Sequence, residues 1–235
     1  MLSNFKQRTE IIIGKKGIDK LNNAKVIVFG VGGVGGFAVE GLVRAGIGNI
    51  TVVDFDIVDE TNINRQIIAL HSTIGMDKVE LIKNRALDIN PNLKITAYKM
   101  LYDETTSDFL LNEDYDFVVD AIDMVKSKLH LIKACNQRGL KIISSMGMGN
   151  KLNPALIEID DISKTEMCPL AKIVRREVRK MGIKKLKVVY SKEKPSTVAT
   201  METDKSIKKV NGSTSFVPSS AGLLIASYIV NELIK

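Results

Sequence analysis

Two hydrophobic patterns alternate along the chain up to about residue 145. Short apolar runs, typical of buried strands, are followed by longer segments whose apolar residues recur every three to four positions, as they do in helices. This alternation predicts an α/β fold, a Rossmann-like parallel-core sheet with a mixed C-terminal extension. The expected strands are 25–29, 50–53, 94–98, 117–119 and 141–144, and the expected helices are 33–45, 76–89, 107–111 and 127–138.

The pattern is less regular after residue 150. It predicts strands at 156–159 and 187–190 and a final helix at 221–233, packed on the core. Residues 192–220 are rich in Ser, Thr, Lys and Pro, which favours a long loop that is mobile or becomes ordered on a partner. We therefore expect a single domain, 1–235, with a nucleotide-binding half at 1–150 and a basic substrate-binding half at 151–235.

A glycine-rich turn follows the first predicted strand. Gly30, Gly32 and Gly35 have the G-x-G-x-x-G spacing, with Gly33 between them, and Asp54 ends the next strand. Strand, turn and helix in this order place helix N-terminal amides against a phosphate, and an acid about 20 residues later can contact a ribose. Close packing of strand and helix is the simpler explanation of the glycines, but the acid favours nucleotide binding.

Several polar and charged residues follow the predicted strands. Each of them has an ordinary explanation, as a solvated surface group or a helix cap. Together they supply what acyl-adenylate formation needs: cations for a triphosphate and a carboxylate for Mg²⁺. That reaction depends on positioning and charge neutralisation, so no Ser or Cys nucleophile is required. ATP and Mg²⁺ are therefore the expected cofactors, and the candidate residues are Asp56, Asn62, Arg65, Gln66, Lys78 and Asp123.

Positive charge is concentrated in the C-terminal part of the chain. The net charge is +7, yet residues 164–211 hold 14 Lys or Arg against 5 Asp or Glu. A basic helix is commonly only a solvated surface, but this concentration favours a polyanion such as RNA. We expect an apolar helix face of Leu170, Ile173, Val174, Val178 and Met181, and the side chains expected to contact RNA are Lys172, Arg175, Arg176 and Arg179.

Composition narrows the remaining choices. With 45% hydrophobic residues the chain can bury one substantial core. It has no run of about 18 apolar residues and no signal-like N-terminus, so we expect a cytoplasmic protein without a membrane partner. Cys135 and Cys168 are the two cysteines, too few for a disulfide framework or a four-cysteine zinc site. Both are expected to be structural rather than catalytic.

Four motifs, GVGGVG, DFDIVDETNINRQ, GMDKVELIKNRALDINP and VVDAID, resemble the ubiquitin-activating-enzyme-like adenylating superfamily. The resemblance implies a homodimer in which Arg8 reaches the phosphates in the partner subunit's site. It assigns magnesium to Asp123 and catalysis to Arg65, Lys78 and Asp123. The nucleotide contacts that it implies are Gly30, Gly32, Gly33, Gly35, Asp54, Asp56, Asn62, Arg65, Gln66, Lys78, Ala121 and Asp123.

The sulfur-carrier activators in that superfamily carry paired C-x-x-C motifs, which this chain lacks. The lysine at Lys128, the segment PLAKIVRREVRK and the ending NGSTSFVPSSAGLLIASYIVNEL instead resemble the branch of tRNA threonylcarbamoyladenosine dehydratases. That resemblance implies ATP-dependent cyclisation of threonylcarbamoyladenosine in tRNA, with a sulfur-relay protein as a further candidate partner. An adenylating enzyme for a ubiquitin-like sulfur carrier and an NAD-binding protein are the alternatives.

Overall fold

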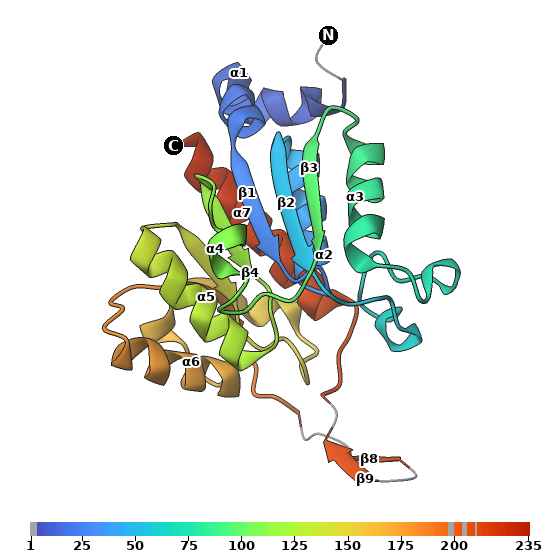
Figure 1. The fold of residues 1–235 in the computed structure, drawn as a ribbon, viewed down its shortest axis with the longest axis vertical. Coiled ribbons are helices and arrows are strands. Elements are labelled where there is room, and N and C mark those ends of the chain that lie inside the picture. Colours follow the sequence, from blue (N-terminus) through green and yellow to red (C-terminus); the bar gives the residue numbers. More distant parts are fainter. Residues whose placement is uncertain (1–3, 197–199, 204–205, 210) are drawn as a thin grey trace.

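The predicted α/β class is confirmed by a seven-stranded sheet in a computed structural model, which describes residues 4–196, 200–203, 206–209 and 211–235 (Figure 1). The strand order is β3-β2-β1-β4-β5-β7-β6, with β6 antiparallel to β7 and all other neighbours parallel. The strands are β1 (Lys25–Phe29), β2 (Asn49–Asp54), β3 (Lys94–Lys99), β4 (Phe117–Asp120), β5 (Ile142–Ser145), β6 (Ile157–Asp161) and β7 (Lys187–Ser191).

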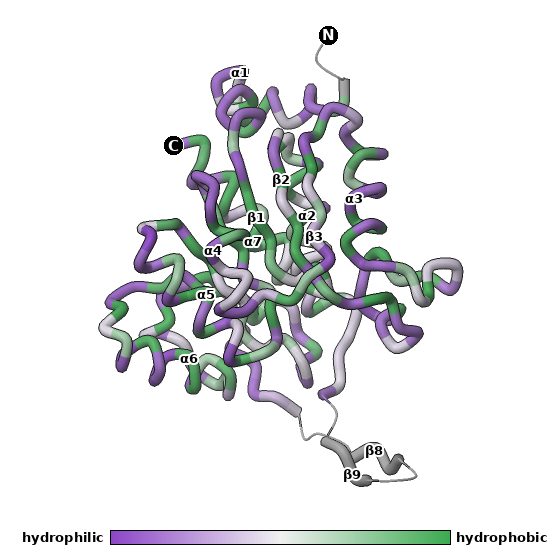
Figure 2. The backbone as a smooth tube through the Cα atoms, viewed as in Figure 1, coloured by the Kyte–Doolittle hydropathy of each residue, from purple (hydrophilic) through white to green (hydrophobic). Residues whose placement is uncertain are grey.

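Helices cover both faces of this sheet. One face packs against α2, α3 and α7, and the other against α4 and α5, with α6 beside α5. Figure 2 shows that hydrophobic and hydrophilic residues alternate along α3 and α6, as expected for helices with one buried side. The α-helices are α1 (Gln7–Asn23), α2 (Gly35–Ala45), α3 (Lys78–Ile89), α4 (Ser107–Leu110), α5 (Val125–Arg138), α6 (Pro169–Lys180) and α7 (Phe216–Ile234), and the 3-10 helices are η1 (Asn4–Lys6), η2 (Glu60–Asn62), η3 (His71–Thr73), η4 (Pro154–Leu156) and η5 (Ile162–Lys164).

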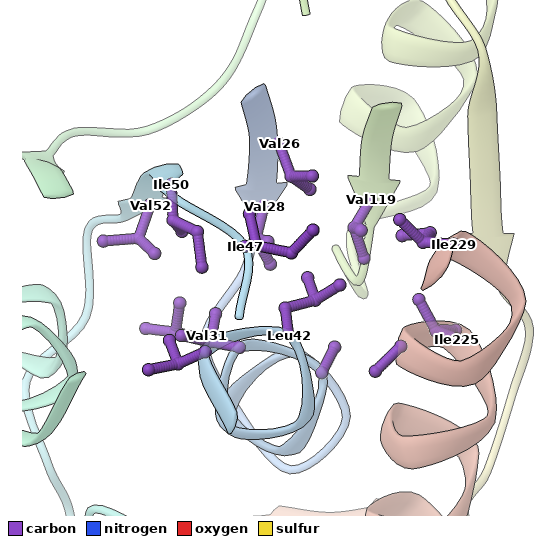
Figure 3. Close-up of a cluster of buried hydrophobic side chains, with 14 of the residues drawn as sticks. Val26, Val28, Val31, Leu42, Ile47, Ile50, Val52, Val119, Ile225 and Ile229 are labelled. Carbon is purple, nitrogen blue, oxygen red and sulfur yellow. The ribbon is translucent and has the colours of Figure 1, made fainter. Parts of the chain in front are cut away.

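The largest hydrophobic core lies between the central strands and α2 and α7. Val28 of β1 and Val119 of β4 point toward Leu42 of α2 and Ile225 of α7, and all four side chains are fully buried (Figure 3). The central strands are apolar on both faces because helices cover both, which explains why they are continuous apolar runs in the sequence.

The C-terminal helix α7 is the one described helix long and apolar enough to cross a membrane, judged by length and composition alone. In the fold it is a core helix. Val217, Ala221, Ile225 and Ile229 are buried in the core that α2 shares. A Cβ at Gly222 would lie 2.3 Å from the Val34 carbonyl oxygen, so the two helices pack in backbone contact at that point.

The prediction of one long loop at residues 192–220 is wrong in two places. It contains a hairpin of β8 (Thr200–Thr203) and β9 (Ser206–Lys209), and α7 begins at Phe216 rather than at residue 221. Pro218 falls in the first helical turn, where no amide hydrogen bond is needed, so it does not end the helix. Residues 197–199, 204–205 and 210 of the predicted loop lie outside the described residues.

Candidate functional site

A cavity of about 550 Å³ opens at the carboxyl ends of β1, β2 and β4. The strand order reverses between β1 and β4, and parallel α/β sheets bind ligands at such a switch point. Residues far apart in the sequence meet there, including a wall from the C-terminal half at 211–213. Ten of the predicted nucleotide-site residues line the cavity: Gly30, Gly32, Gly33, Asp54, Asp56, Arg65, Gln66, Lys78, Ala121 and Asp123.

The glycine-rich turn forms one wall of this cavity. Gly30 has a φ of +84°, a conformation that L side chains rarely adopt. A Cβ on Gly35 would lie 1.8 Å from the Gly30 carbonyl oxygen, so only glycine lets α2 begin this close to the turn. At Gly32, in contrast, the nearest atom would be 3.6 Å away. Gly35 therefore lies behind the wall and shapes it, while Gly32 faces the cavity.

Asp54, at the end of β2, holds the turn in place. Its Oδ2 accepts a hydrogen bond from the Val31 amide at 2.7 Å, and its Oδ1 accepts one from the Asp56 amide at 2.9 Å. Burial raises the pKa of Asp54 above its ordinary value, although the two amide hydrogen bonds oppose that shift. The sequence predicted a ribose contact for this acid, and the structure adds a second role in fixing the loop.

Two cationic side chains stand beside the turn. Lys78, whose side chain is almost fully buried, places its Nζ 2.9 Å from Oδ2 of the half-exposed Asp56. Arg65 donates from one guanidinium nitrogen to the Thr61 carbonyl and to Asn64 Oδ1, both at 2.8 Å. An anion in the cavity would thus compete with Asp56 for a positive charge that is already in place.

Two polar groups in the cavity have hydrogen-bonding capacity to spare. Gln66 has a buried Oε1 that has no hydrogen-bond partner among the described residues. The carboxylate of Asp123 is exposed, lies in the loop after β4, and likewise accepts no hydrogen bond from the described parts of the chain. Because buried polar atoms are nearly always paired in native proteins, the Gln66 oxygen is available as a hydrogen-bond acceptor at this wall of the cavity.

Three predicted site residues do not line the cavity. Gly35 lies behind the turn, as described above. Asn62 is buried beside it, where its Oδ1 accepts a hydrogen bond from the Asp59 amide at 3.2 Å and closes η2. Arg8 is exposed on α1, which precedes β1 and lies at the opposite ends of the strands (Figure 1). Arg8 therefore does not reach the cavity of its own chain.

The basic helix α6 starts at the cavity, since Leu170 in its first turn is part of the lining. The predicted apolar face is partly wrong: Ala171, Val174 and Val178 are buried, whereas Ile173 and Met181 are 40% and 38% exposed. Only these three residues of α6 are buried, so the apolar face of the helix is narrower than predicted.

The four predicted RNA-contacting residues on α6 differ in their surroundings. Arg175 donates from one guanidinium nitrogen to both the carbonyl and the hydroxyl oxygen of Thr165 at 2.6 Å, so its side chain secures the preceding loop. Arg176 is exposed and pairs with Glu177 at 2.8 Å. Lys172 and Arg179 are exposed. Arg175 is thus held by a contact within the chain, whereas the side chains of the other three are exposed.

Both cysteines are buried, as expected. Burial raises the pKa of the Cys135 thiol to about 12, which is the environment of a packed side chain rather than of a nucleophile. Cys168 is 4% exposed, and its Sγ lies 3.9 Å from the Gly147 carbonyl oxygen.

The remaining lining is mostly apolar and carried no signal in the sequence. It comes from four separate segments, and no single segment has a motif that marks it. Only the topology brings them to one cavity. The main members are Met100, Leu101, Met124, Met146, Met148 and Leu170.

Comparison with known proteins gives a consistent picture. The model of the ThiF family matches residues 6–235. The tRNA threonylcarbamoyladenosine dehydratase of Bacillus subtilis is 45% identical over 245 residues, which span 100% of this chain and 96% of that protein.

The Escherichia coli tRNA N6-threonylcarbamoyladenosine dehydratase TcdA, solved in complex with ATP, superimposes with a TM-score of 0.87 at 28% identity, covering 97% of this chain and 93% of that one. The adenylyltransferase and sulfurtransferase UBA4 of Vanderwaltozyma polyspora is 36% identical, over 59% of this chain and 31% of that protein.

Proposed function

Because this chain belongs to the ThiF family, we propose that it is an ATP-dependent tRNA threonylcarbamoyladenosine dehydratase. The observation that carries this conclusion is the cavity, in which the glycine turn, Asp54, Lys78 and Asp123 converge at the switch point of the sheet. The full-length similarity to the Bacillus subtilis dehydratase supports the choice of substrate.

The chemistry follows from the charges in the cavity. The triphosphate of ATP lies against the glycine turn and the N-terminus of α2, where backbone amides favour an anion. Lys78 and Arg65 neutralise its charge. The carboxylate of the threonyl group attacks the α-phosphorus and pyrophosphate leaves. A nucleophile within the same modified nucleoside then attacks the acyl carbon and AMP leaves, so the ring closes with the net loss of one water.

The protein's part in these steps is positioning and charge neutralisation. No protein nucleophile is needed, since the attacking groups belong to the substrate. This agrees with the burial of Cys135 and Cys168, neither of which is among the residues that line the cavity.

Magnesium is proposed to be held by Asp123. Among residues 4–196, 200–203, 206–209 and 211–235, no three His, Cys, Asp or Glu side chains cluster as a metal site. A single exposed carboxylate nevertheless fits Mg²⁺, which commonly uses one or two carboxylates together with substrate phosphates and water. When bound, the ion would offset the charge of the phosphates next to Lys78.

Asp123→Ala tests this assignment together with the function. Purified protein is incubated with ATP, Mg²⁺ and tRNA that carries threonylcarbamoyladenosine. The tRNA is then digested, and the masses of its nucleosides are measured by mass spectrometry. We expect the wild-type protein to yield a nucleoside lighter by one water. Asp123→Ala should fold and yield none. Product formation by Asp123→Ala would refute the role of that carboxylate.

The tRNA is proposed to lie along α6, because this helix leads away from the cavity and exposes Lys172, Arg176 and Arg179. Removing one side chain that contacts a phosphate should lower the slope of log affinity against log salt by about 1. Arg176→Ala/Arg179→Ala should therefore reduce that slope by about 2. The matched control Lys83→Ala/Lys94→Ala removes the same charge from α3 and β3, at the far edge of the sheet, and should leave the slope unchanged.

A homodimer is proposed from the surface of α1. Ile11 and Ile12, one turn after Arg8, are 77% and 84% exposed, and large exposed apolar side chains of this kind indicate a protein interface. A second copy of the chain is the proposed partner, with Arg8 entering its cavity.

Mixing subunits tests this arrangement. Arg8→Ala and Asp123→Ala should each be inactive alone. After they are unfolded together and refolded at equal amounts, random pairing should restore about one quarter of the sites, because each mixed dimer of a two-fold assembly has one intact site. No recovery, despite mixed dimers on native mass spectrometry, would exclude a shared site.

The similarity to UBA4 over part of the chain keeps a second function in view, adenylation of a ubiquitin-like sulfur carrier. It predicts exchange of pyrophosphate into ATP that is stimulated by a protein ending in two glycines. Stimulation by such a protein, and none by modified tRNA, would favour this alternative over the dehydratase.

A further inference from the structure

A lysine and an aspartate form an ion pair that is completely shielded from solvent beneath the cavity. Lys128 of α5 and Asp120 of β4 are both 0% exposed, and Lys128 Nζ lies 2.8 Å from Asp120 Oδ2. The same ammonium group donates to Ser144 Oγ at 3.3 Å and to the Ser145 carbonyl at 2.9 Å. All three ammonium hydrogens thus have an acceptor.

A pair of this kind contributes little net stability. Removing two charges from water costs several kcal/mol per ion, which the mutual attraction barely recovers, and well-packed apolar residues of similar volume often stabilise a protein equally well or better. The main effect of Lys128 and Asp120 is therefore on geometry, because a fully hydrogen-bonded ammonium group fixes the relative positions of its acceptors.

The two residues of the pair lie at opposite ends of the loop that carries Asp123. Asp120 is the last residue of β4 and Lys128 lies in the first turn of α5, with only residues 121–127 between them. Asp120 Oδ1 accepts a hydrogen bond from the Ile122 amide at 3.1 Å, and the Lys128 amide donates to the Met124 carbonyl at 3.0 Å. Asp123, whose carboxylate accepts no hydrogen bond within the described chain, depends on these anchors.

The same ammonium group also reaches the neighbouring wall of the cavity, which follows β5. Ser144 and Ser145 end β5, the strand next to β4, and Ser145 and Met146 line the same cavity as Asp123. Lys128 therefore joins the Asp123 loop to the wall that follows β5. If the ammonium group is removed, the Asp123 loop loses its side-chain link to this wall, and the backbone pairing of β4 with β5 remains.

We propose that Lys128 and Asp120 are positioning residues that hold Asp123 in place for magnesium-bound ATP. The inference rests on the proposed role of Asp123. Outer-shell partners of metal ligands typically change metal affinity by about 10- to 100-fold when they are removed, so loss of the ammonium group should weaken binding of MgATP and leave binding of free ATP almost unchanged.

A double-mutant cycle measured by calorimetry tests this proposal without any tRNA. The dissociation constants of MgATP and of ATP in EDTA are measured for wild type, Lys128→Met, Asp123→Ala and the double variant. Lys128→Met should weaken MgATP binding by about 10-fold in the wild-type background and by less than about 2-fold in the Asp123→Ala background, because interacting residues are not additive. An equal loss in both backgrounds, or no loss in either, would overturn the proposal.

Three further variants separate positioning from general damage. Lys128→Arg keeps the charge and should bind MgATP more tightly than Lys128→Met. Ser144→Ala removes one acceptor of the Lys128 ammonium group and the hydroxyl that donates to Asp120 Oδ2, and it keeps the ion pair itself. It should show a smaller loss with the same dependence on Asp123, which keeps the proposal testable if Lys128→Met does not fold. Glu40→Gln breaks an ion pair with Arg44 and Arg85 away from the cavity and should leave MgATP affinity within about 2-fold.

The outcomes also separate this inference from the function on which it rests. Failure of the wild-type protein to bind MgATP would overturn both. Wild-type affinity in Asp123→Ala would overturn the magnesium assignment and this inference with it. Loss of affinity in Asp123→Ala but not in Lys128→Met or Ser144→Ala would overturn this inference alone.

Discussion

Replacing Gly35 with alanine should disrupt the phosphate-binding turn from behind, whereas the same change at Gly32 should leave the turn intact and fill the cavity. The added Cβ at Gly35 would lie 1.8 Å from the Gly30 carbonyl oxygen, and the added Cβ at Gly32 would lie 3.6 Å from its nearest neighbour. The two substitutions are chemically identical and three residues apart, so each is the control for the other.

The size of the effect follows from these distances. Ordinary contacts of a Cβ begin at 3.4 Å, so α2 would have to move by about 1.6 Å relative to the turn or the turn would have to open. Opening puts at risk the hydrogen bonds of the Gly30 amide to the Val53 carbonyl and of the Val31 amide to Asp54. Two such bonds at about 1 kcal/mol each, with an overpacking cost of about 1–3 kcal/mol, give a loss of about 3–5 kcal/mol.

Urea unfolding and calorimetric titration with ATP distinguish the two sites. Gly35→Ala should lower the free energy of unfolding by about 3–5 kcal/mol. Gly32→Ala should lower it by less than about 1 kcal/mol, because the new methyl group meets no clash. Gly32→Ala should still bind ATP at least about 10-fold more weakly, since the methyl group occupies the space beside the backbone amides that a phosphate needs.

A Gly35→Ala protein within about 1 kcal/mol of the wild type would refute the reasoning. It would mean that α2 and the turn can separate without cost, and that Gly35 is not required by the packing described here. Wild-type ATP affinity in Gly32→Ala would in turn show that the phosphates do not approach the turn at that residue.

Three further predictions concern single side chains. Lys78→Met should weaken ATP binding by at least about 10-fold in calorimetry. It should change the free energy of unfolding by less than about 1 kcal/mol, because its partner Asp56 is half exposed. A large loss of stability with normal ATP affinity would contradict the phosphate role. Arg175→Ala should lower the free energy of unfolding by about 1–3 kcal/mol, since the buried Thr165 oxygens lose their donor, without changing the salt dependence of tRNA binding; a changed salt slope would place Arg175 on the RNA after all. Cys135 should resist iodoacetamide in the folded protein at pH 8.5, because a thiol whose pKa is raised to about 12 stays protonated at that pH. Modification of Cys135 in peptide mass maps of the folded protein would contradict its packed environment.

The sequence predicted the central sheet well because its strands are buried on both faces. β1 begins and ends at the predicted residues, Lys25 and Phe29, since the continuous apolar run 26–29 between Lys25 and Gly30 has few alternatives. The start of α7 at Phe216 was missed, because Pro218 and three serines within residues 215–220 suggest a loop. The burial of Val217 in the core that α2 shares shows that the helix already packs there.

The candidate site was predictable where a motif carries the chemistry. The glycine turn, Asp54, Lys78 and Asp123 meet in one cavity because all of them follow strands that end at the same edge of the sheet.

Contacts between side chains distant in sequence were not predictable. The bond of Arg175 to Thr165 and the pairing of Lys128 with Asp120 depend on how α6 and α5 are rotated on the core, and a basic or apolar pattern does not specify that rotation to within one side chain.

The central claim is tested most directly by the release of pyrophosphate and AMP from ATP. Wild-type protein with Mg²⁺ is given either tRNA that carries threonylcarbamoyladenosine or the same tRNA without that modification. The proposed function predicts one pyrophosphate and one AMP per modified tRNA, and none with the unmodified tRNA. Equal release with both tRNAs, or none with either, would contradict the proposal that this cavity activates the threonyl carboxylate.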